Sequence, residues 1–320
     1  MSVAIMSWAF ASIAGAQDFS PVSVRNDRPY SLLFLRFLPG SSPLQTGRSA
    51  WTLSGSAANS LNFVPDQLVG AFAKEDIEAD RLDIRYARGI GRGWELAAQV
   101  AVEDLGPGFL DPIISWYHRT FLRLHNIRNF VPYGGHVVYS PAGGPFSGGF
   151  GFGDTSLFAS KALGGESFVS GGLKLPTGNP GELLGSGSVD AGISGQTGWR
   201  LGRKLGLTVN GAAVAQGSAT RLHHTRGLVL QGGVALVYAP NRRDSWIVQA
   251  NYEDSPLVEG IEALDKVEPS TTFGYRRALS NRQSLTAYFM EDINPVNSNF
   301  PIGANIGPDF VIGLVWTYKL

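Results

Sequence analysis

The chain has 320 residues, and only 16% of them are charged, whereas a soluble domain usually carries about 25% charged residues. Basic and acidic residues are equal in number, 26 of each, which excludes the strong net field that favours a nucleic acid. The absence of cysteine excludes disulfides, thiolate metal sites and cysteine nucleophiles. No run of about 18 apolar residues offers a membrane-spanning helix. With 41 glycines, 7 Trp, 10 Tyr and 18 Phe, the composition favours an all-β protein of the transmembrane β-barrel type, in which only alternate residues of a strand meet lipid.

Residues 1–16 have the pattern of a secretory signal peptide. An apolar run precedes Ala14-Gly15-Ala16, a cleavage site of small residues, although no basic residue occurs before Arg25. The alternative is a buried strand or a short helix. We expect the mature chain to begin near Gln17.

The residues that follow divide into two parts. We expect an N-terminal periplasmic or lumenal segment at 17–50 and a transmembrane barrel at 51–320. Within the first part, residues 30–38 are apolar on both faces of an extended chain, and Pro39 ends the run. Such a run does not fit a half-exposed strand, so we predict that this segment packs inside or beneath the barrel.

Apolar and mixed positions alternate systematically from Trp51 onward. From Phe310 to Leu320, every even-numbered residue is apolar, whereas the odd-numbered residues are mixed. Side chains alternate across a strand, so each such strand has one wholly apolar face. The same division occurs in 94–103, 189–200 and 245–253, each with an aromatic residue near one end, where an interfacial girdle would lie. A water-soluble barrel with its apolar face inside is the alternative, because parity alone does not say which face points outward.

Short turns rich in glycine, asparagine or basic residues join these segments into five hairpins. The turns are Gly89–Gly93, Gly164–Glu166, Gly202–Lys204, Pro240–Asp244 and Ser280–Arg282. Longer connections separate the hairpins, at 64–79, 104–150, 177–186, 218–227, 257–268 and 294–307. A first strand at about 51–63 and a last strand at about 309–320 bring the total to about 12 strands of an antiparallel up-and-down β-barrel. Short periplasmic turns and long extracellular loops are typical of bacterial outer-membrane barrels.

Three short motifs carry a resemblance to known proteins. The ending Gly313-Leu-Val-Trp316-Thr-Tyr318-Lys-Leu320 resembles the β-signal that the barrel-assembly machinery recognises in Gram-negative outer-membrane proteins, although that signal usually ends in Phe. The assembly signal would thus be carried by Gly313, Trp316, Tyr318 and Leu320. Residues 172–190 resemble a strand–loop–strand segment of several uncharacterised outer-membrane channel families. Residues 25–30, together with Asp111 and His118, are similar to a family of bacterial barrel proteins of unknown function.

The resemblance implies the location and the partners of the protein, but no substrate and no catalytic residue. It implies the cell outer membrane, with outer-membrane lipid, lipopolysaccharide and, during insertion, the barrel-assembly machinery as partners. Nucleic acid is not expected as a partner, and the oligomeric state stays open.

The longest connection, 104–150, is predicted to contain one amphipathic helix. Asp111 is expected to be its N-cap with Pro112 at the first helical position, and apolar residues follow at helical spacing. His118, Arg119 and Arg123 then follow without an acidic residue. They could form a constriction inside the lumen near Glu95 and Glu103, lie at the rim against lipopolysaccharide phosphates, or belong to a helix that only covers loop backbone.

The face opposite the apolar one gives the candidate lumen residues. It carries both signs of charge and several amides: Asp83, Arg85, Glu95, Gln99, Glu103, Asp190, Arg200, Asn251 and Arg276. A barrel of this size lies between the filled eight-stranded barrels and the open porins. We therefore expect a narrow passive channel for small solutes. The alternative is a structural or surface-interaction barrel with a plugged lumen and no transport.

An enzyme is not expected. All five histidines fall in the predicted long loops, so no Ser–His pair lies on a strand, where a hydrolase embedded in the wall would need it. The adjacent pair His223-His224 has no third ligand nearby in the sequence, and the acidic loops near 64–80 and 253–268 match no calcium-loop spacing. We therefore expect no cofactor and no metal site, while binding of divalent cations by the acidic loops stays open.

Overall fold

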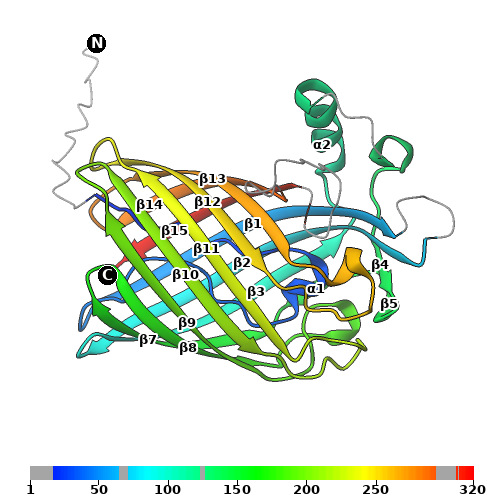
Figure 1. Cartoon of the computed structure of the whole chain (residues 1–320), viewed down its shortest axis with the longest axis horizontal. Coiled ribbons are helices and arrows are strands. Elements are labelled where there is room, and N and C mark those ends of the chain that lie inside the picture. Colours follow the sequence, from blue (N-terminus) through cyan, green and yellow to red (C-terminus); the bar gives the residue numbers. More distant parts are fainter. Residues whose placement is uncertain (1–16, 65–70, 123–126, 293–307, 309) are drawn as a thin grey trace, which may run out of the picture.

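The computed structural model describes residues 17–64, 71–122, 127–292, 308 and 310–320. Twelve antiparallel strands close into a barrel (Figure 1). In ring order they are β1 (Ser49–Val64), β2 (Ala73–Gly91), β3 (Trp94–Gly106), β7 (Thr155–Gly164), β8 (Ser167–Leu175), β9 (Asp190–Arg200), β10 (Leu205–Ala215), β11 (Leu228–Tyr238), β12 (Asp244–Glu253), β13 (Glu268–Ala278), β14 (Gln283–Glu291) and β15 (Phe310–Lys319). The ring closes because Trp51 of β1 lies opposite Tyr86 of β2 on one side and opposite Tyr318 of β15 on the other. The predicted twelve-stranded barrel is confirmed.

The two ends of the barrel differ in their connections. All five predicted short turns join neighbouring strands at one end, which we call the turn end, and β1 begins and β15 ends there. The long connections gather at the other end, the loop end (Figure 1). The connection predicted at 64–79 is shorter than expected, because β2 already begins at Ala73 and pairs with the end of β1. The predicted signal peptide and the predicted loop 294–307 lie outside the described residues.

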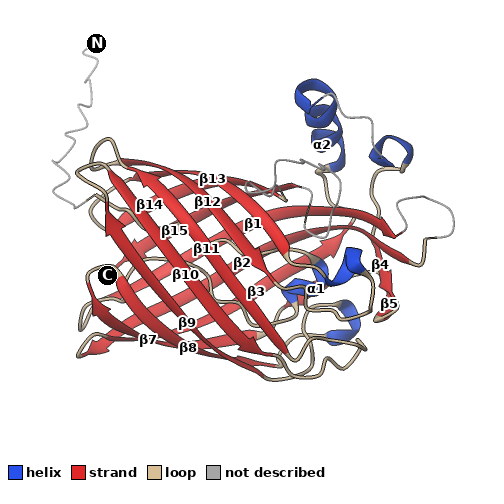
Figure 2. Cartoon of the chain, viewed as in Figure 1, coloured by secondary structure: helices blue, strands red, loops and turns tan. Residues whose placement is uncertain are grey.

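The loops carry the smaller elements (Figure 2). Between β3 and β7 come α2 (Asp111–Tyr117), a π-helical turn (His118–Leu122), a 3-10 turn (Ile127–Phe130), the hairpin of β4 (Val137–Ser140) and β5 (Gly143–Phe146), and β6 (Phe150–Phe152). The remaining short helices are α1 (Pro29–Leu32), a 3-10 turn (Pro180–Glu182) and α3 (Glu262–Asp265). None of the helices in the described ranges is both long and apolar enough to span a membrane.

The apolar face of the strands points outward. On β3, Leu96 and Ala98 are exposed, whereas Glu95 and Ala97 are buried. Exposed aromatic side chains occur near both ends of the wall, with Trp51, Trp94, Trp199 and Trp246 near the turn end and Phe109, Trp116, Phe150 and Phe152 near the loop end. An apolar outer band with an aromatic girdle at each border is the arrangement of a membrane barrel.

Candidate functional site

Residues 17–48 form a hairpin that lies inside the barrel, and we call it the lumenal hairpin. It starts at the turn end, where the side-chain amide of Gln17 donates to the carbonyl of Ala239 at 2.9 Å. It rises to the loop end, turns through α1, and returns to the turn end, where the amide of Gly47 donates to the carbonyl of Gly89 at 2.9 Å. In Figure 1 it is the dark blue segment within the ring of strands. The lumen is therefore occupied along its length.

Polar side chains of the wall bind the backbone of the lumenal hairpin. Five hairpin N–H groups donate to wall side chains, namely Val22 to Gln249 (3.1 Å), Leu35 to Asp190 (2.8 Å), Phe37 to Gln231 (3.2 Å), Gly40 to Gln196 (3.1 Å) and Leu44 to Glu95 (2.9 Å). A buried backbone group needs a partner, and these extended residues are not part of the sheet. The amides and carboxylates on the inner face thus take the place of a neighbouring strand.

Buried ion pairs fix the hairpin at the loop end. Arg28, which is fully buried, binds Glu75 of β2 at 2.6 Å and Glu268 of β13 at 2.5 Å. Arg36 binds Glu253 of β12 at 2.7 Å through its Nε. Removing only one partner of such a pair strongly destabilises a protein, because the other charge stays buried. These contacts therefore hold the hairpin in place.

Glycines of the wall make room for apolar side chains of the hairpin. Gly172 and Gly192 lie opposite each other on β8 and β9, and a Cβ at either position would come within 2.8 Å of the Phe37 ring. A Cβ at Gly274 would lie 2.8 Å from Cγ2 of Val22. The inner wall is thus shaped to the hairpin on opposite sides of the ring.

Five of the predicted lumen residues form two polar groups on β2 and β3. Asp83 accepts from Arg81 at 2.7 Å and from the amide of Gln99 at 2.9 Å, while Arg85 donates to Glu95 at 3.0 Å. Arg81 also binds Glu103, which is buried. Because these side chains neutralise one another, this part of the wall adds little net charge to the lumen.

The other four predicted lumen residues lie in different surroundings. Asp190 is buried and accepts from the backbone of Leu35, Asn251 accepts from Gln249 at 2.9 Å, and Arg276 donates to the carbonyls of Ser20 and Pro21 at 2.9 Å. Arg200 differs: its side chain is 55% exposed at the turn end, where the nearest carboxylate is Glu166 at 3.8 Å. It belongs to the mouth of the barrel, because β9 ends at this residue.

The predicted lumenal constriction by the loop helix is wrong. Ile114 of α2 packs with Ala57 of β1 and Phe310 of β15, and the ring of Tyr117 contacts Phe289 and Phe310. These strand residues have the outward parity, so α2 covers the outside of the wall and projects from it (Figure 1). The helical spacing predicted an apolar side that included Ile113, Trp116 and Tyr117, but of these only Tyr117 packs on the wall, and the buried apolar residue is Ile114. Periodicity also does not say against which surface a helix packs.

The basic residues of this loop therefore do not line the lumen. His118 is buried and Arg119 is exposed on the outer side of the barrel, while Arg123 lies outside the described residues. Asp111 is also not the N-cap, since it is the first residue of α2. Its carboxylate instead binds Arg128 at 2.7 Å and accepts from the amide of Gly134 at 2.8 Å, so it organises the loop that follows.

The proposed assembly-signal residues lie on β15. The rings of Trp316 and Tyr318 are stacked with their centroids 5.8 Å apart, and the amide of Leu320 donates to the carbonyl of Ser49 at 2.8 Å. Gly313 is needed on the inner face, because a Cβ there would overlap the ring of Tyr288. No interaction in the structure tests recognition by the assembly machinery, so that role stays a prediction.

Sequence reasoning missed most of the charged residues that hold the hairpin. These are Arg28, Arg36, Glu75, Glu253 and Glu268. Lys174 acts indirectly, since its Nζ lies 3.4 Å from Asp190, the carboxylate that accepts from the backbone of Leu35. Glu75 shares the inward parity of Asp83 and lies four inward positions before it on β2, so extending the strand toward its start would have found it. The partners on the hairpin follow only from the folded arrangement.

The space that the hairpin leaves free lies in the turn half of the lumen. A cavity of about 180 Å³ lies between the hairpin and a wall of mixed character, where Thr52, Ser54, Gln99, Ser160, Ser194 and Thr286 line it together with Ala50, Ala87, Phe158, Phe168 and Val315. A wider hollow of about 730 Å³ shares residues with this cavity, including Arg276 and Thr317, and occupies the mouth of the barrel at the turn end. The two spaces together form a polar path from the turn end to the middle of the lumen.

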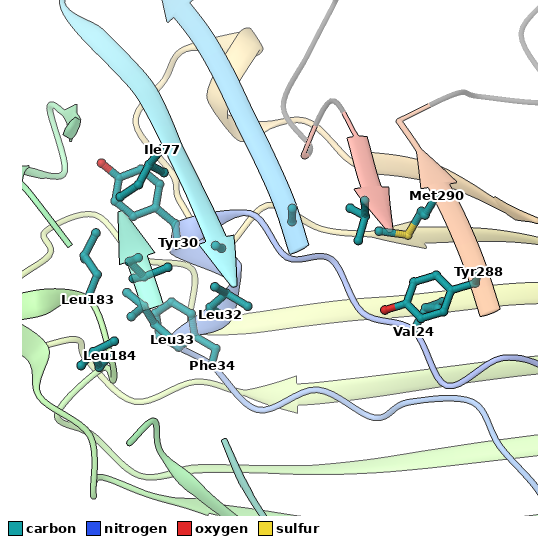
Figure 3. Packing of buried hydrophobic residues seen from close by; sticks show 14 of the residues in the cluster. Val24, Tyr30, Leu32, Leu33, Phe34, Ile77, Leu183, Leu184, Tyr288 and Met290 are labelled. Atoms are coloured by element: carbon teal, nitrogen blue, oxygen red, sulfur yellow. The ribbon is translucent and has the colours of Figure 1, made fainter. Parts of the chain in front are cut away.

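At the loop end an apolar cluster closes this path. Tyr30, Leu32, Leu33 and Phe34, in and next to α1, pack with Ile77 of β2 and with Leu183 and Leu184 (Figure 3). Further along the hairpin, Val24 packs beside Tyr288 and Met290 of β14 (Figure 3). Buried apolar packing of this kind excludes water. The lumen is therefore polar and partly open toward the turn end, and apolar and closed toward the loop end.

No metal site is found in the part of the chain that the structure describes, where no group of three or more His, Asp or Glu side chains could hold an ion.

The fold is similar to that of solved outer-membrane barrels. The COG4313 outer membrane channel from Pseudomonas putida F1 is 12% identical, with 88% of this chain and 98% of that chain covered and a TM-score of 0.53. The NanC porin is 10% identical, with 84% and 100% covered and a TM-score of 0.47, and the toluene transporter TodX from Pseudomonas putida is 10% identical, with 85% and 89% covered and a TM-score of 0.42. At such identities the likeness shows the fold alone, which is that of an outer-membrane β-barrel.

Two further comparisons concern the sequence. Comparison with curated proteins finds no significant match. A family model described as "Protein of unknown function (DUF3187)" matches residues 1–320.

Proposed function

The chain therefore belongs to this family of proteins of unknown function, and we propose that it is a gated outer-membrane channel for small polar solutes, with the lumenal hairpin as the gate. The turn end is then periplasmic and the loop end extracellular. In the described state the gate is closed, because α1 and its apolar neighbours fill the loop end.

One observation carries this proposal: the polar path that runs from the mouth at the turn end to the apolar cluster around α1. A barrel that serves only as a scaffold is expected to fill its interior with packed side chains, as small barrels do. Here a polar cavity of about 180 Å³ remains, and it continues into a mouth of about 730 Å³. Hydroxyl groups such as those of Thr52, Ser160 and Thr286 line the cavity beside apolar residues, so it offers hydrogen-bond partners to a small solute.

The way the hairpin is bound also supports a gate. Its backbone is held by single side-chain hydrogen bonds from glutamines and carboxylates of the wall, and not by a ladder of strand pairing. Each such bond contributes about 1 kcal/mol net, since water replaces it when it breaks. A segment held in this way can move without opening the ring of strands.

A second candidate function is a barrel with a permanent plug and no transport. The ion pairs of Arg28 with Glu75 and Glu268 favour it, because moving Arg28 away would leave the two carboxylates buried without a countercharge. The two candidates differ in one property, the movement of the hairpin.

A reversible covalent lock tests that movement. The chain has no native cysteine, and Cγ2 of Val22 lies 2.8 Å from the Cβ that a side chain at 274 would have. A sulfur in place of Cγ2 would therefore lie within bonding reach of a sulfur carried by that Cβ. The double variant Val22→Cys with Gly274→Cys is reconstituted in planar bilayers, and single-channel currents are recorded under oxidising and then reducing conditions.

We expect discrete openings in the reduced state that disappear on oxidation and return on reduction. The single variant Val22→Cys serves as the control, since it cannot form the lock and leaves Gly274 in place. A correctly folded barrel that stays silent when reduced, and stays silent when Arg28→Ala removes the ion pairs, would instead establish the permanent plug.

A further inference from the structure

The mouth at the turn end is strongly basic. The hollow of about 730 Å³ is lined by Arg48, Arg200, Arg242, Arg243, Arg282 and Lys319, with Arg276 at its inner side. These residues come from the entry to β1, the end of β9, two turns and β15, so they surround the hollow instead of following one strand. In a chain with 26 basic and 26 acidic residues, this gathering is a local departure from neutrality.

The acidic residues of the mouth do not balance it. Asp18 and Glu166 are the two carboxylates among the residues that line the hollow. Asp18 binds Arg276 at 3.0 Å, and Glu166 lies 3.8 Å from Arg200 and accepts from the hydroxyl of Ser42 at 3.0 Å. Both carboxylates are thus already engaged, while Arg48, Arg242 and Arg282 also line the hollow.

The hollow also offers neutral donors for oxyanions. Ser41, Ser280 and Ser284 line it together with the side-chain amides of Gln45 and Asn281. Guanidinium groups with neighbouring hydroxyl and amide donors are the groups that bind phosphate, sulfonate and carboxylate in proteins. A concave site lined by one sign of charge also raises the local concentration of the opposite ion.

We propose that this mouth is a binding site for small multivalent anions, such as a phosphorylated or polycarboxylate solute, on the periplasmic side of the barrel. The site is complete while the hairpin is in place, so it does not depend on opening of the channel. We commit to a soluble anion rather than a phospholipid headgroup, because the basic side chains line the inside of the mouth together with residues 17–20 and 41–45 of the hairpin.

Equilibrium binding of a fluorescent trisulfonated pyrene dye to the full chain in neutral detergent tests the proposal. We expect saturable binding that weakens as salt is added and that inorganic pyrophosphate competes away. The variant Arg242→Glu with Arg282→Glu is expected to bind at least about tenfold more weakly, since each replaced charge turns an attraction into a repulsion.

The matched control changes the same amount of charge on a neighbouring turn. Arg203 and Lys204 are exposed at the same end of the barrel but do not line the hollow. The variant Arg203→Glu with Lys204→Glu is expected to bind within about twofold of the unaltered chain. An equal loss in both double variants would overturn the site and leave only a general surface potential.

Two further outcomes distinguish this proposal from a lipid headgroup site and from the channel proposal. Displacement of the dye by soluble short-chain phosphatidylglycerol at concentrations at which pyrophosphate has no effect would show a lipid headgroup site and overturn the soluble-anion proposal. Binding of the dye by a barrel that never conducts would support this site while it overturns the channel, whereas a conducting barrel that does not bind the dye would do the reverse.

Discussion

Glu253 and Glu268 lie directly opposite each other on β12 and β13, and each is bound by a different arginine of the lumenal hairpin. Like charges at directly opposed positions destabilise a sheet. Arg36 and Arg28 supply the countercharges from within the lumen, and Arg28 also reaches Glu75 on β2. The sheet and the hairpin are therefore electrostatically interdependent: the wall is acidic at the place where the hairpin is basic.

The first prediction follows from this pairing. Arg28→Ala should destabilise the docked hairpin by about 3–5 kcal/mol, because it leaves Glu75 and Glu268 buried without their partner. Urea unfolding in phospholipid vesicles and limited proteolysis of residues 17–48 measure the effect. Arg277→Ala is the control, since its pair with Asp244 has a half-exposed guanidinium and should change stability by less than about 1 kcal/mol. Equal effects of the two changes would argue against the interdependence.

The second prediction concerns the two faces of β3. Ala98 is exposed on the outer wall, and an arginine there should cost roughly 2–4 kcal/mol near the bilayer midplane and impair insertion. Gln99→Arg should be tolerated, because the amide of Gln99 already donates to Asp83 inside the lumen. Heat-modifiable migration on gels reports the folded fraction of each variant. A damaging Gln99→Arg together with a silent Ala98→Arg would reverse the assigned faces.

The third prediction uses the glycines of the wall. Gly172→Ala places a methyl group within 2.8 Å of the Phe37 ring and close to Phe158. Residues 33–44, the part of the hairpin that returns to the turn end, should therefore be displaced, and the protein should be destabilised by about 1–3 kcal/mol. Gly171→Ala on the same strand meets only a carbonyl oxygen at 4.0 Å and should be neutral. Hydrogen exchange of residues 33–44 measures the displacement. Adding Phe37→Ala to Gly172→Ala should restore protection, and a double variant no better protected than Gly172→Ala would rule out this steric cause.

The fourth prediction concerns pH at the loop end. Glu259, in the connection between β12 and β13, accepts from the hydroxyl of Ser140 at 2.9 Å and from the amide of Ala142. Burial raises the pKa of its carboxyl above the usual glutamate value, against the opposing effect of these two hydrogen bonds. A raised pKa in the folded state gives a stability contribution that is fully present below the ordinary value, about 4.3, and is lost as pH rises through the raised value.

Docking of this connection on the β4–β5 hairpin should therefore be tighter in acid than at neutral pH. Hydrogen exchange of residues 254–261, corrected for intrinsic rates at each pH, measures it. Glu259→Gln should remove the pH dependence, and a variant with an unchanged pH profile would assign the effect to another group.

The strand count and the turns were predictable from the sequence because both depend on local patterns. Apolar residues alternate with other residues along β15 and β3, so these strands can be recognised without knowing which strands they pair with. Glycines such as Gly93 and Gly165 mark the turns, where they adopt positive φ angles. The start of β2 was misplaced, because residues 73–79 mix charged and apolar side chains and pair with β1 beyond the apolar band.

The lumenal hairpin could be placed only in outline. Its residues 30–38 are apolar on both faces, which predicts a buried segment but no partner. The contact of Arg28 with Glu268 joins positions 240 residues apart, and no local pattern encodes such a separation. The same limit applies to α2, because neither the surface on which it packs nor its buried apolar residue, Ile114, was predictable from helical spacing.

The position of α2 has a consequence for how the ring of strands comes apart. β1 and β15 are the first and last strands of the ring, and their junction is where a linear chain becomes a cylinder. Ile114 and Tyr117 pack on Ala57, Phe310 and Phe289 across this junction, and the carboxylate of Asp111 accepts from the amide of Asn59 of β1 at 3.3 Å. The contacts of α2 therefore hold β1 and β15 together near the loop end. Under heat or force, we expect these two strands to separate first at Ser49 and Lys319, and to remain paired near the loop end until α2 detaches.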